Sequence, residues 1–212
     1  MRPRLDRERS HPEDPEPGRV RHSACHGQPR RHRDRGAQQG PDRVLAADKV
    51  EEVEFFYRYY RFVEAGHRAD VITPSGGPLT GLRGFGIQHT QPLADADAAD
   101  YLLLYVPGGL APTQLRTDPA ALDFIRAFAT AHKPIGLVCH GPQVLVWAGL
   151  VDGLRLTSWP EVGPEIEAAG GTWIDEPIVQ DRNIFTARKP GDQPAELHRI
   201  MTFLDHQEDH DA

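Results

Sequence analysis

The segment IGLVCHGPQVL, residues 135–145, decides the fold that we expect. It begins with a short apolar run, typical of a buried strand in a parallel sheet. The residues after Cys139 predict a helix, with Pro142 in the first turn, where proline is favoured. Cys139 therefore lies where the chain turns from strand to helix. On such a turn, the side chain is pushed out over the carboxyl edge of the sheet, as in the elbows that expose hydrolase nucleophiles.

Outward from this unit, short apolar runs alternate with amphipathic stretches. We predict helices over residues 51–65 and 119–132, because apolar side chains recur there at helical spacing. The run YLLLYV, residues 101–106, is apolar at every position, as in a strand covered on both faces, and Gly108 and Gly109 follow it closely. This alternation predicts an α/β fold with a mostly parallel sheet.

Residues 1–40 differ in composition from the rest of the chain. They contain ten arginines and six acidic residues and almost lack large apolar side chains. We expect them to form a disordered basic tail ahead of a folded domain at residues 41–208. The folded part carries the acidic excess behind the whole-chain charge of −7, so nucleic acid is not an expected partner.

Targeting and cofactor signals are weak in this sequence. No apolar run is long enough for a membrane-spanning helix, and the first residues lack the apolar segment of a secretory signal. Two cysteines, Cys25 and Cys139, suggest a reducing compartment rather than a disulfide framework. We therefore expect a cytoplasmic protein with no membrane partner. The tail histidines around Cys25 have no recognised zinc spacing, so we expect no metal.

Cys139 has two interpretations. A lone cysteine is commonly a small buried hydrophobic residue. Against that, the N-terminus of the following helix would lower the thiol pKa and stabilise thiolate, the competent nucleophile. The N–H groups of Gly109 and His140 would converge on an oxyanion beside the sulfur. We therefore predict that Cys139 is a nucleophile and that Gly109 and His140 form its oxyanion site.

Five segments occur in an order that resembles the ThiJ/PfpI superfamily. They are AADKVEEVE, VPGGLAP, GLVCHGPQVL, LTSWP and ARKPGD. The resemblance spans roughly residues 43–205 and is greatest to the PfpI intracellular protease branch, whose relatives include the Parkinsonism-associated deglycase. It implies a flavodoxin-like three-layer α/β/α sandwich, similar to that of class I glutamine amidotransferases. A true amidotransferase would need a downstream His-x-Glu pair, which the late histidines do not form.

The resemblance also implies roles for particular residues. Cys139 would be the nucleophile and His140 an acid and base toward a bound carbonyl. Glu54 would lie beside the sulfur and be protonated, because burial and the thiolate charge raise its pKa. We expect the neighbouring Glu51 and Glu52 to be exposed helical carboxylates. Relatives place an aromatic residue near the pocket at the position of Trp159, although a core position fits Trp159 equally well.

Thr113 departs from the family pattern. PfpI-type proteases carry a glutamate there, which reaches across a subunit interface to orient the histidine. Threonine cannot supply that charge, so the resemblance implies a cysteine-dependent enzyme in which peptidase activity is doubtful. The expected substrates are reactive small-molecule carbonyls (deglycase-like or glyoxalase-like) or peptides, with no organic cofactor. The alternative is a non-enzymatic redox-sensing or chaperone-like stress protein of the same fold, in which Cys139 is oxidised.

Relatives of this kind are dimers or larger homo-oligomers, and the same is expected here. Tyr59, Tyr60 and Phe62, on the first predicted helix, offer more aromatic surface than one core-facing stripe requires.

Overall fold

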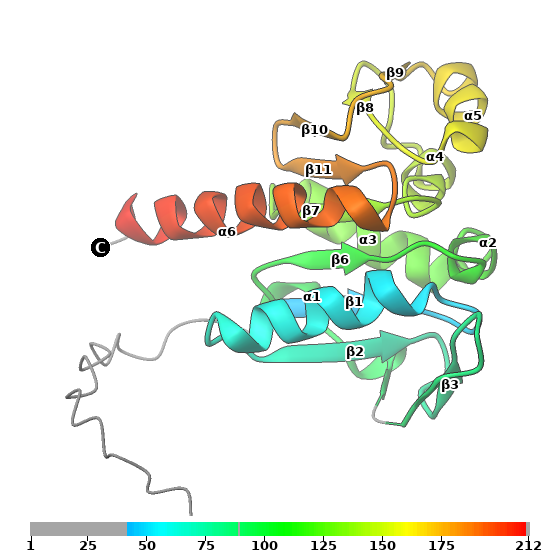
Figure 1. The fold of residues 1–212 in the computed structure, drawn as a ribbon, viewed down its shortest axis with the longest axis vertical. Helices are drawn as coiled ribbons and strands as arrows, with labels where there is room; N and C mark the ends of the chain where they lie inside the picture. The colour runs from blue at the N-terminus through cyan, green and yellow to red at the C-terminus, as the bar shows by residue number, and fades with distance from the viewer. Residues whose placement is uncertain (1–41, 89, 211–212) are drawn as a thin grey trace, which may run out of the picture. The chain divides into compact units, whose positions relative to one another are not determined.

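A mostly parallel sheet of seven strands forms the framework of the protein (Figure 1). The structure, a computed structural model, describes residues 42–88 and 90–210. The strand order is β10-β11-β7-β6-β1-β2-β5, and β10 is the strand that runs antiparallel to its neighbour. The strands are β1 (Asp42–Leu45), β2 (Ala69–Thr73), β5 (Gln91–Pro92), β6 (Leu104–Val106), β7 (Ile135–Val138), β10 (Ile178–Asp181) and β11 (Ile184–Ala187).

Helices cover both faces of this sheet. In Figure 1, α1 and α6 lie in front of the strands and α3 lies behind them. The α-helices are α1 (Glu52–Glu64), α2 (Ala111–Leu115), α3 (Pro119–Thr130), α4 (Gln143–Ala148), α5 (Gly163–Ala168) and α6 (Gln193–His210). The structure confirms the predicted three-layer α/β/α sandwich.

Shorter elements complete the described chain. The strands β3 (Leu79–Thr80) and β4 (Gly86–Ile87) form an antiparallel pair, and β8 (Arg155–Leu156) and β9 (Thr172–Trp173) form a parallel one. Single turns of 3₁₀-helix are η1 (Leu93–Asp95), η2 (Ala98–Asp100), η3 (Pro160–Val162) and η4 (Pro190–Asp192).

One predicted boundary and one missed element differ from the structure. The strand expected over residues 101–106 pairs only from Leu104 to Val106, although Tyr101 and Leu103 are also buried. A buried segment is apolar whether or not it forms hydrogen bonds with a neighbouring strand. Hydrophobicity alone therefore overestimates strand length. The short helix α2 was missed because its sequence APTQL is too short to show a helical period.

The centre of the core lies around β6 and β7, which are buried on both faces. All the residues of these two strands are buried. Phe128 of α3 and Phe62 of α1 are also fully buried. The carboxyl ends of parallel strands share one edge of a sheet, so the segments after β6 and β7 are neighbours by construction.

Within residues 42–88 and 90–210, no helix combines the length and apolarity needed to cross a bilayer. The predicted tail over residues 1–40 lies outside the described residues.

We expect Lys133→Met to lower the free energy of unfolding by about 2 kcal/mol, because charged hydrogen bonds are lost. The Lys133 ammonium donates to the carbonyl oxygens of Ala98, Ala99 and Tyr101 at 2.8, 2.7 and 2.7 Å, and so ties the end of α3 to the segment before β6. Urea unfolding measures the change, with the exposed Lys189→Met as the control. Equal stability of the two variants would contradict this role.

Candidate active site

Cys139 occupies the predicted elbow between β7 and α4. Its φ of 59° places a non-glycine residue in the left-handed region, a strained conformation that clusters at functional sites. The Cys139 N–H donates to the carbonyl of Ala187 at 2.9 Å, and its carbonyl accepts from Trp159 N–H at 2.8 Å. The neighbouring segments thus hold the strained turn from both sides.

Two glycines make room for this turn. A Cβ on Gly141 would lie 2.6 Å from the carbonyl oxygen of Val106. A Cβ on Gly108 would lie 2.7 Å from Glu54 Oε2 and 2.8 Å from the Cβ of Cys139. Any larger residue at either position would push the elbow away from its neighbours.

Glu54 lies beside the sulfur, as the resemblance implied. It is completely buried on α1, and its Oε2 accepts a hydrogen bond from Gly108 N–H at 2.7 Å. Burial raises the pKa of Glu54 to about 7, although the Gly108 N–H and a hydrogen bond with Cys139 act to lower it. The expected raised pKa is confirmed, and the carboxyl group holds a proton well above the usual pH range for glutamate.

The expected lowering of the Cys139 pKa by the following helix is wrong. Burial, the Glu54 charge and the hydrogen bond with Glu54 raise the pKa of the thiol, while hydrogen bonds from the backbones of His140 and Gly109 lower it. The helix α4 has six residues, which limits its dipole. The thiol and the carboxyl group therefore form one coupled pair that carries a single negative charge once its first proton leaves.

The predicted oxyanion donors reach the sulfur from two loops. Gly109 follows β6 and His140 follows β7, and the backbones of both interact with Cys139. Gly109 has a φ of 77°, so its left-handed backbone suits glycine. Donors that converge on the sulfur also lie close to an oxygen on a carbon bonded to it.

The His140 ring lies beside the Cys139 sulfur and stacks on an aromatic neighbour. Its Nδ1 lies 3.3 Å from Cys139 Sγ, and its ring stacks on Trp159 with centroids 6.4 Å apart. Burial lowers the pKa of His140, whereas the charges of Glu161 and Glu165 raise it. The net lowering favours neutral imidazole at pH 7. Trp159 is 37% exposed, so it lies at the rim of the site and not in the core.

Thr113 does not take part in this arrangement. Its hydroxyl donates to the carbonyl of Leu110 at 2.6 Å, within the first turn of α2. The acidic groups that act on His140 come instead from η3 and α5. Sequence reasoning missed Glu161 and Glu165, because only the folded positions of η3 and α5 bring them near the elbow.

The expectation that Glu51 and Glu52 are exposed is also wrong, since both are buried. Arg83, from the turn between β3 and β4, forms ion pairs with both carboxylates. Glu52 Oε1 also accepts from the Arg83 N–H at 2.5 Å. The β3–β4 segment therefore covers the start of α1.

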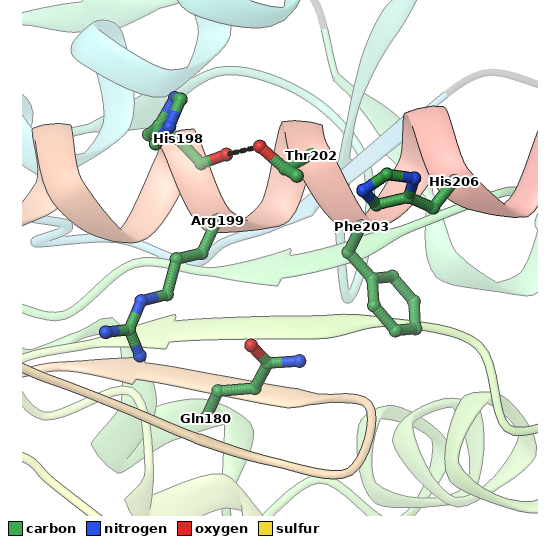
Figure 2. Close-up of a pocket in the computed structure, with 6 residues that line it drawn as sticks. All are labelled: Gln180, His198, Arg199, Thr202, Phe203 and His206. Atoms are coloured by element: carbon green, nitrogen blue, oxygen red, sulfur yellow. Dashed lines mark hydrogen bonds between the residues drawn. The ribbon is translucent and has the colours of Figure 1, made fainter.

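A surface pocket lies between β10 and α6 and shares no residue with the Cys139 site. Figure 2 shows Arg199 and Phe203 extending from α6 toward β10, and the Thr202 hydroxyl donating to the carbonyl of His198 at 2.9 Å. The lining residues are Gln180, His198, Arg199, Thr202, Phe203 and His206. In the described ranges, no three His, Cys, Asp or Glu side chains are grouped to hold a metal ion.

We expect alkylation of Cys139 by iodoacetamide to rise through about pH 7, where Glu54 titrates and the coupled pair takes up its charge. In Glu54→Gln this inflection should disappear, because the thiol then titrates alone. Rates measured against pH in a Cys25→Ser background report on Cys139 only. Glu51→Gln is the matched control: it should keep the inflection at a slightly lower pH, because the Glu51 charge raises the pKa of Glu54. An unchanged profile in Glu54→Gln would overturn the coupling.

Comparisons with known proteins agree with this geometry. Residues 43–202 match the DJ-1/PfpI family. The chain is 32% identical to the deglycase PfpI of Pyrococcus furiosus, covering 76% of this chain and 96% of the relative. It is 35% identical to general stress protein 18 of Bacillus subtilis, covering 76% and 96%. A two-domain protein from Anabaena variabilis with a DJ-1/ThiJ/PfpI-like domain superposes with a TM-score of 0.73 at 29% identity, covering 76% of this chain and 48% of that one. The elbow, its two glycine loops and these matches together show that the chain belongs to the DJ-1/PfpI family.

Proposed function

We propose that the protein is a cysteine-dependent enzyme that acts on reactive small-molecule carbonyls, in the manner of a deglycase or glyoxalase. The observation that carries this proposal is the convergence of three groups on the Cys139 sulfur: the Glu54 carboxyl group and the backbones of Gly109 and His140. A buried structural cysteine needs none of these. The relative from Pyrococcus furiosus is named a deglycase, which supports an enzyme of this type.

The reaction would begin with a proton shift inside the coupled pair. The thiol proton moves to the Glu54 carboxylate, and the thiolate attacks the carbonyl carbon. A C–S bond forms while the π electron pair of the carbonyl moves to its oxygen. The N–H groups of Gly109 and His140 stabilise the resulting oxyanion. The adduct is a hemithioacetal once that oxygen takes up a proton.

His140 is suited to the proton transfers that follow. A neutral imidazole 3.3 Å from the sulfur both accepts and returns a proton near pH 7. Trp159 covers one side of this ring and partly shields it from water. For a dicarbonyl, proton transfer between the two carbons turns the hemithioacetal into a thioester. Water then attacks the thioester carbon and gives a proton to His140, the C–S bond breaks as the hydroxy acid leaves, and the thiolate recovers its proton from Glu54.

Peptide hydrolysis fits the site less well than carbonyl addition. Expulsion of an amine needs imidazolium, which an orienting carboxylate stabilises. At the family position for that carboxylate stands Thr113, whose hydroxyl is bonded to its own helix. The net lowering of the His140 pKa also disfavours imidazolium, and therefore peptide hydrolysis.

The redox-sensing alternative is less well supported. Sensor cysteines are exposed thiols of low pKa. Cys139 is only partly exposed, and burial together with the Glu54 charge raises its pKa. We further propose a cytoplasmic location, which the low cysteine content of the chain supports.

We also propose that the protein is a homo-oligomer, through an aromatic face on α1 and the β3–β4 turn. Tyr60 is 61% exposed and Phe85 is 60% exposed, and both rings pack against Phe56. Tyr59 is partly buried, and its ring lies edge-on to Tyr60. Phe62, expected on this face, is fully buried in the core and contributes nothing to it.

Cys139→Ala should lower the turnover of methylglyoxal by purified protein on the order of 10³-fold or more, because the C–S bond cannot form. Loss of methylglyoxal and formation of its hydroxy acid product are followed together. The matched control is Cys25→Ala, which should keep wild-type rates. Turnover that survives Cys139→Ala would overturn the proposed function.

Tyr60→Glu combined with Phe85→Glu should shift the protein to monomer, because two buried carboxylates would face each other across a symmetric interface. Sedimentation velocity gives the oligomeric state. Arg61→Glu, a charge change on the same helix, is the control and should leave the assembly intact. A wild-type monomer would contradict the proposal directly.

A further inference from the structure

A buried cluster of charge lies next to the catalytic site and is not used by the mechanism above. Arg58 lies one helical turn after Glu54 on α1 and is completely buried. Its guanidinium carbon lies 3.3 Å from the ring centroid of Tyr105 on β6. It forms an ion pair with Glu196 of α6, which is also buried.

Two contacts join the cluster to the site. Gln193, in the first turn of α6, donates to the backbone carbonyl of Glu54 at 3.2 Å. A Cβ on Gly136, in the strand that leads to Cys139, would lie 3.2 Å from Arg58 Nη1. The cation therefore lies between α1, α6 and the two strands whose ends carry the nucleophile and its oxyanion donors.

Hydrogen bonds do not fully satisfy this cation. Arg58 donates through Nη2 to Glu196, while its buried Nε and Nη1 have no hydrogen-bond partner in the described structure. Burying a charge pair is costly, and well-packed apolar residues of similar volume commonly do as well for stability. Packing alone is therefore a weak explanation for the pair.

We propose that the Arg58–Glu196 ion pair sets the pH at which the Cys139–Glu54 pair takes up its negative charge, with Arg58 favouring the charge and Glu196 opposing it. Both are positioning residues, since they act through Glu54 and touch no substrate. The inference deepens the proposed function, because it concerns the same nucleophile.

The groups around Glu54 support these opposite signs. On α1, the Arg58 charge lowers the pKa of Glu54 and the Glu51 charge raises it. From α6, Glu196 is coupled to Glu54 by mutual repulsion, since the Glu54 charge raises the pKa of Glu196. Burial raises the pKa of Tyr105, which stays neutral at physiological pH. Arg58 is thus the buried cation on α1 that lies one helical turn from Glu54.

The experiment compares Arg58→Met with Glu196→Gln in the full chain carrying Cys25→Ser. The rate of iodoacetamide alkylation of Cys139 is measured against pH. Arg58→Met should raise the midpoint by roughly one pH unit, the size expected for one charge at this range in a protein interior. Glu196→Gln should lower the midpoint by a smaller amount. A purely structural role would not move the two midpoints in opposite directions.

Further variants keep the result decisive if a single substitution prevents folding. Arg58→Met with Glu196→Gln removes both charges and leaves none unpaired. Because Arg58 is one turn from Glu54, this double variant should have a midpoint above wild type and below Arg58→Met. Arg58→Lys should restore the wild-type midpoint. Circular dichroism and thermal melts confirm folding. Equal directions in the two single variants, or a double variant at or below the wild-type midpoint, would overturn the proposal.

This outcome is separable from that of the proposed function, because alkylation needs no substrate. If no carbonyl compound is turned over while the midpoints move as stated, the proposed function fails and the ion pair still tunes the nucleophile. If turnover depends on Cys139 while the midpoints stay fixed, the function stands and this inference falls.

Discussion

The hydrogen bond from Gly108 N–H to the Glu54 carboxyl group is the contact on which the site depends. It joins α1 to the loop after β6, at the point where a Cβ on Gly108 would meet both Glu54 and Cys139. The same loop places the Gly109 N–H beside the sulfur, and the antiparallel bridge between Val50 and Gly109 fixes its other side. One backbone N–H therefore positions the Glu54 carboxyl group, and the next lies beside the Cys139 sulfur.

This arrangement gathers several buried charges in a small volume. Glu51, Glu52 and Glu54 all lie within the first turn of α1 or just before it, and all are buried. Arg83 neutralises the first two from outside, and Arg58 faces Glu54 from within the core. Burial raises the pKa of Glu54, whereas backbone N–H groups, those of Arg83 and Phe85 among them, together with the Arg83 charge lower the pKa of Glu52 despite its burial.

Local sequence predicted the parts of the site that depend on neighbouring residues. The apolar run before Cys139 and the proline after it fix the elbow, and Gly108 and Gly109 end a strand that must be adjacent in a parallel sheet. Contacts distant in sequence could not be predicted in this way. Arg83 comes from a loop 31 residues or more beyond the carboxylates that it pairs with, and Glu196 lies 138 residues from Arg58. The sign of the Cys139 pKa shift was missed for the same reason. The local sequence predicts the helix after Cys139, but the burial of the thiol and its contact with Glu54 depend on residues distant in sequence.

A raised thiol pKa is compatible with a nucleophile when the proton has somewhere to go. In the proposed reaction it moves from sulfur to a carboxyl group whose own pKa is about 7, so the two groups compete for one proton. The thiolate that forms is more basic than one of low pKa, and intrinsic nucleophilicity rises with basicity. The N–H groups of Gly109 and His140 also stabilise charge on sulfur, and in the proposed addition that charge would pass to the carbonyl oxygen. The raised pKa therefore keeps the resting thiol protonated. The site favours the thiolate when a bound electrophile can accept its negative charge.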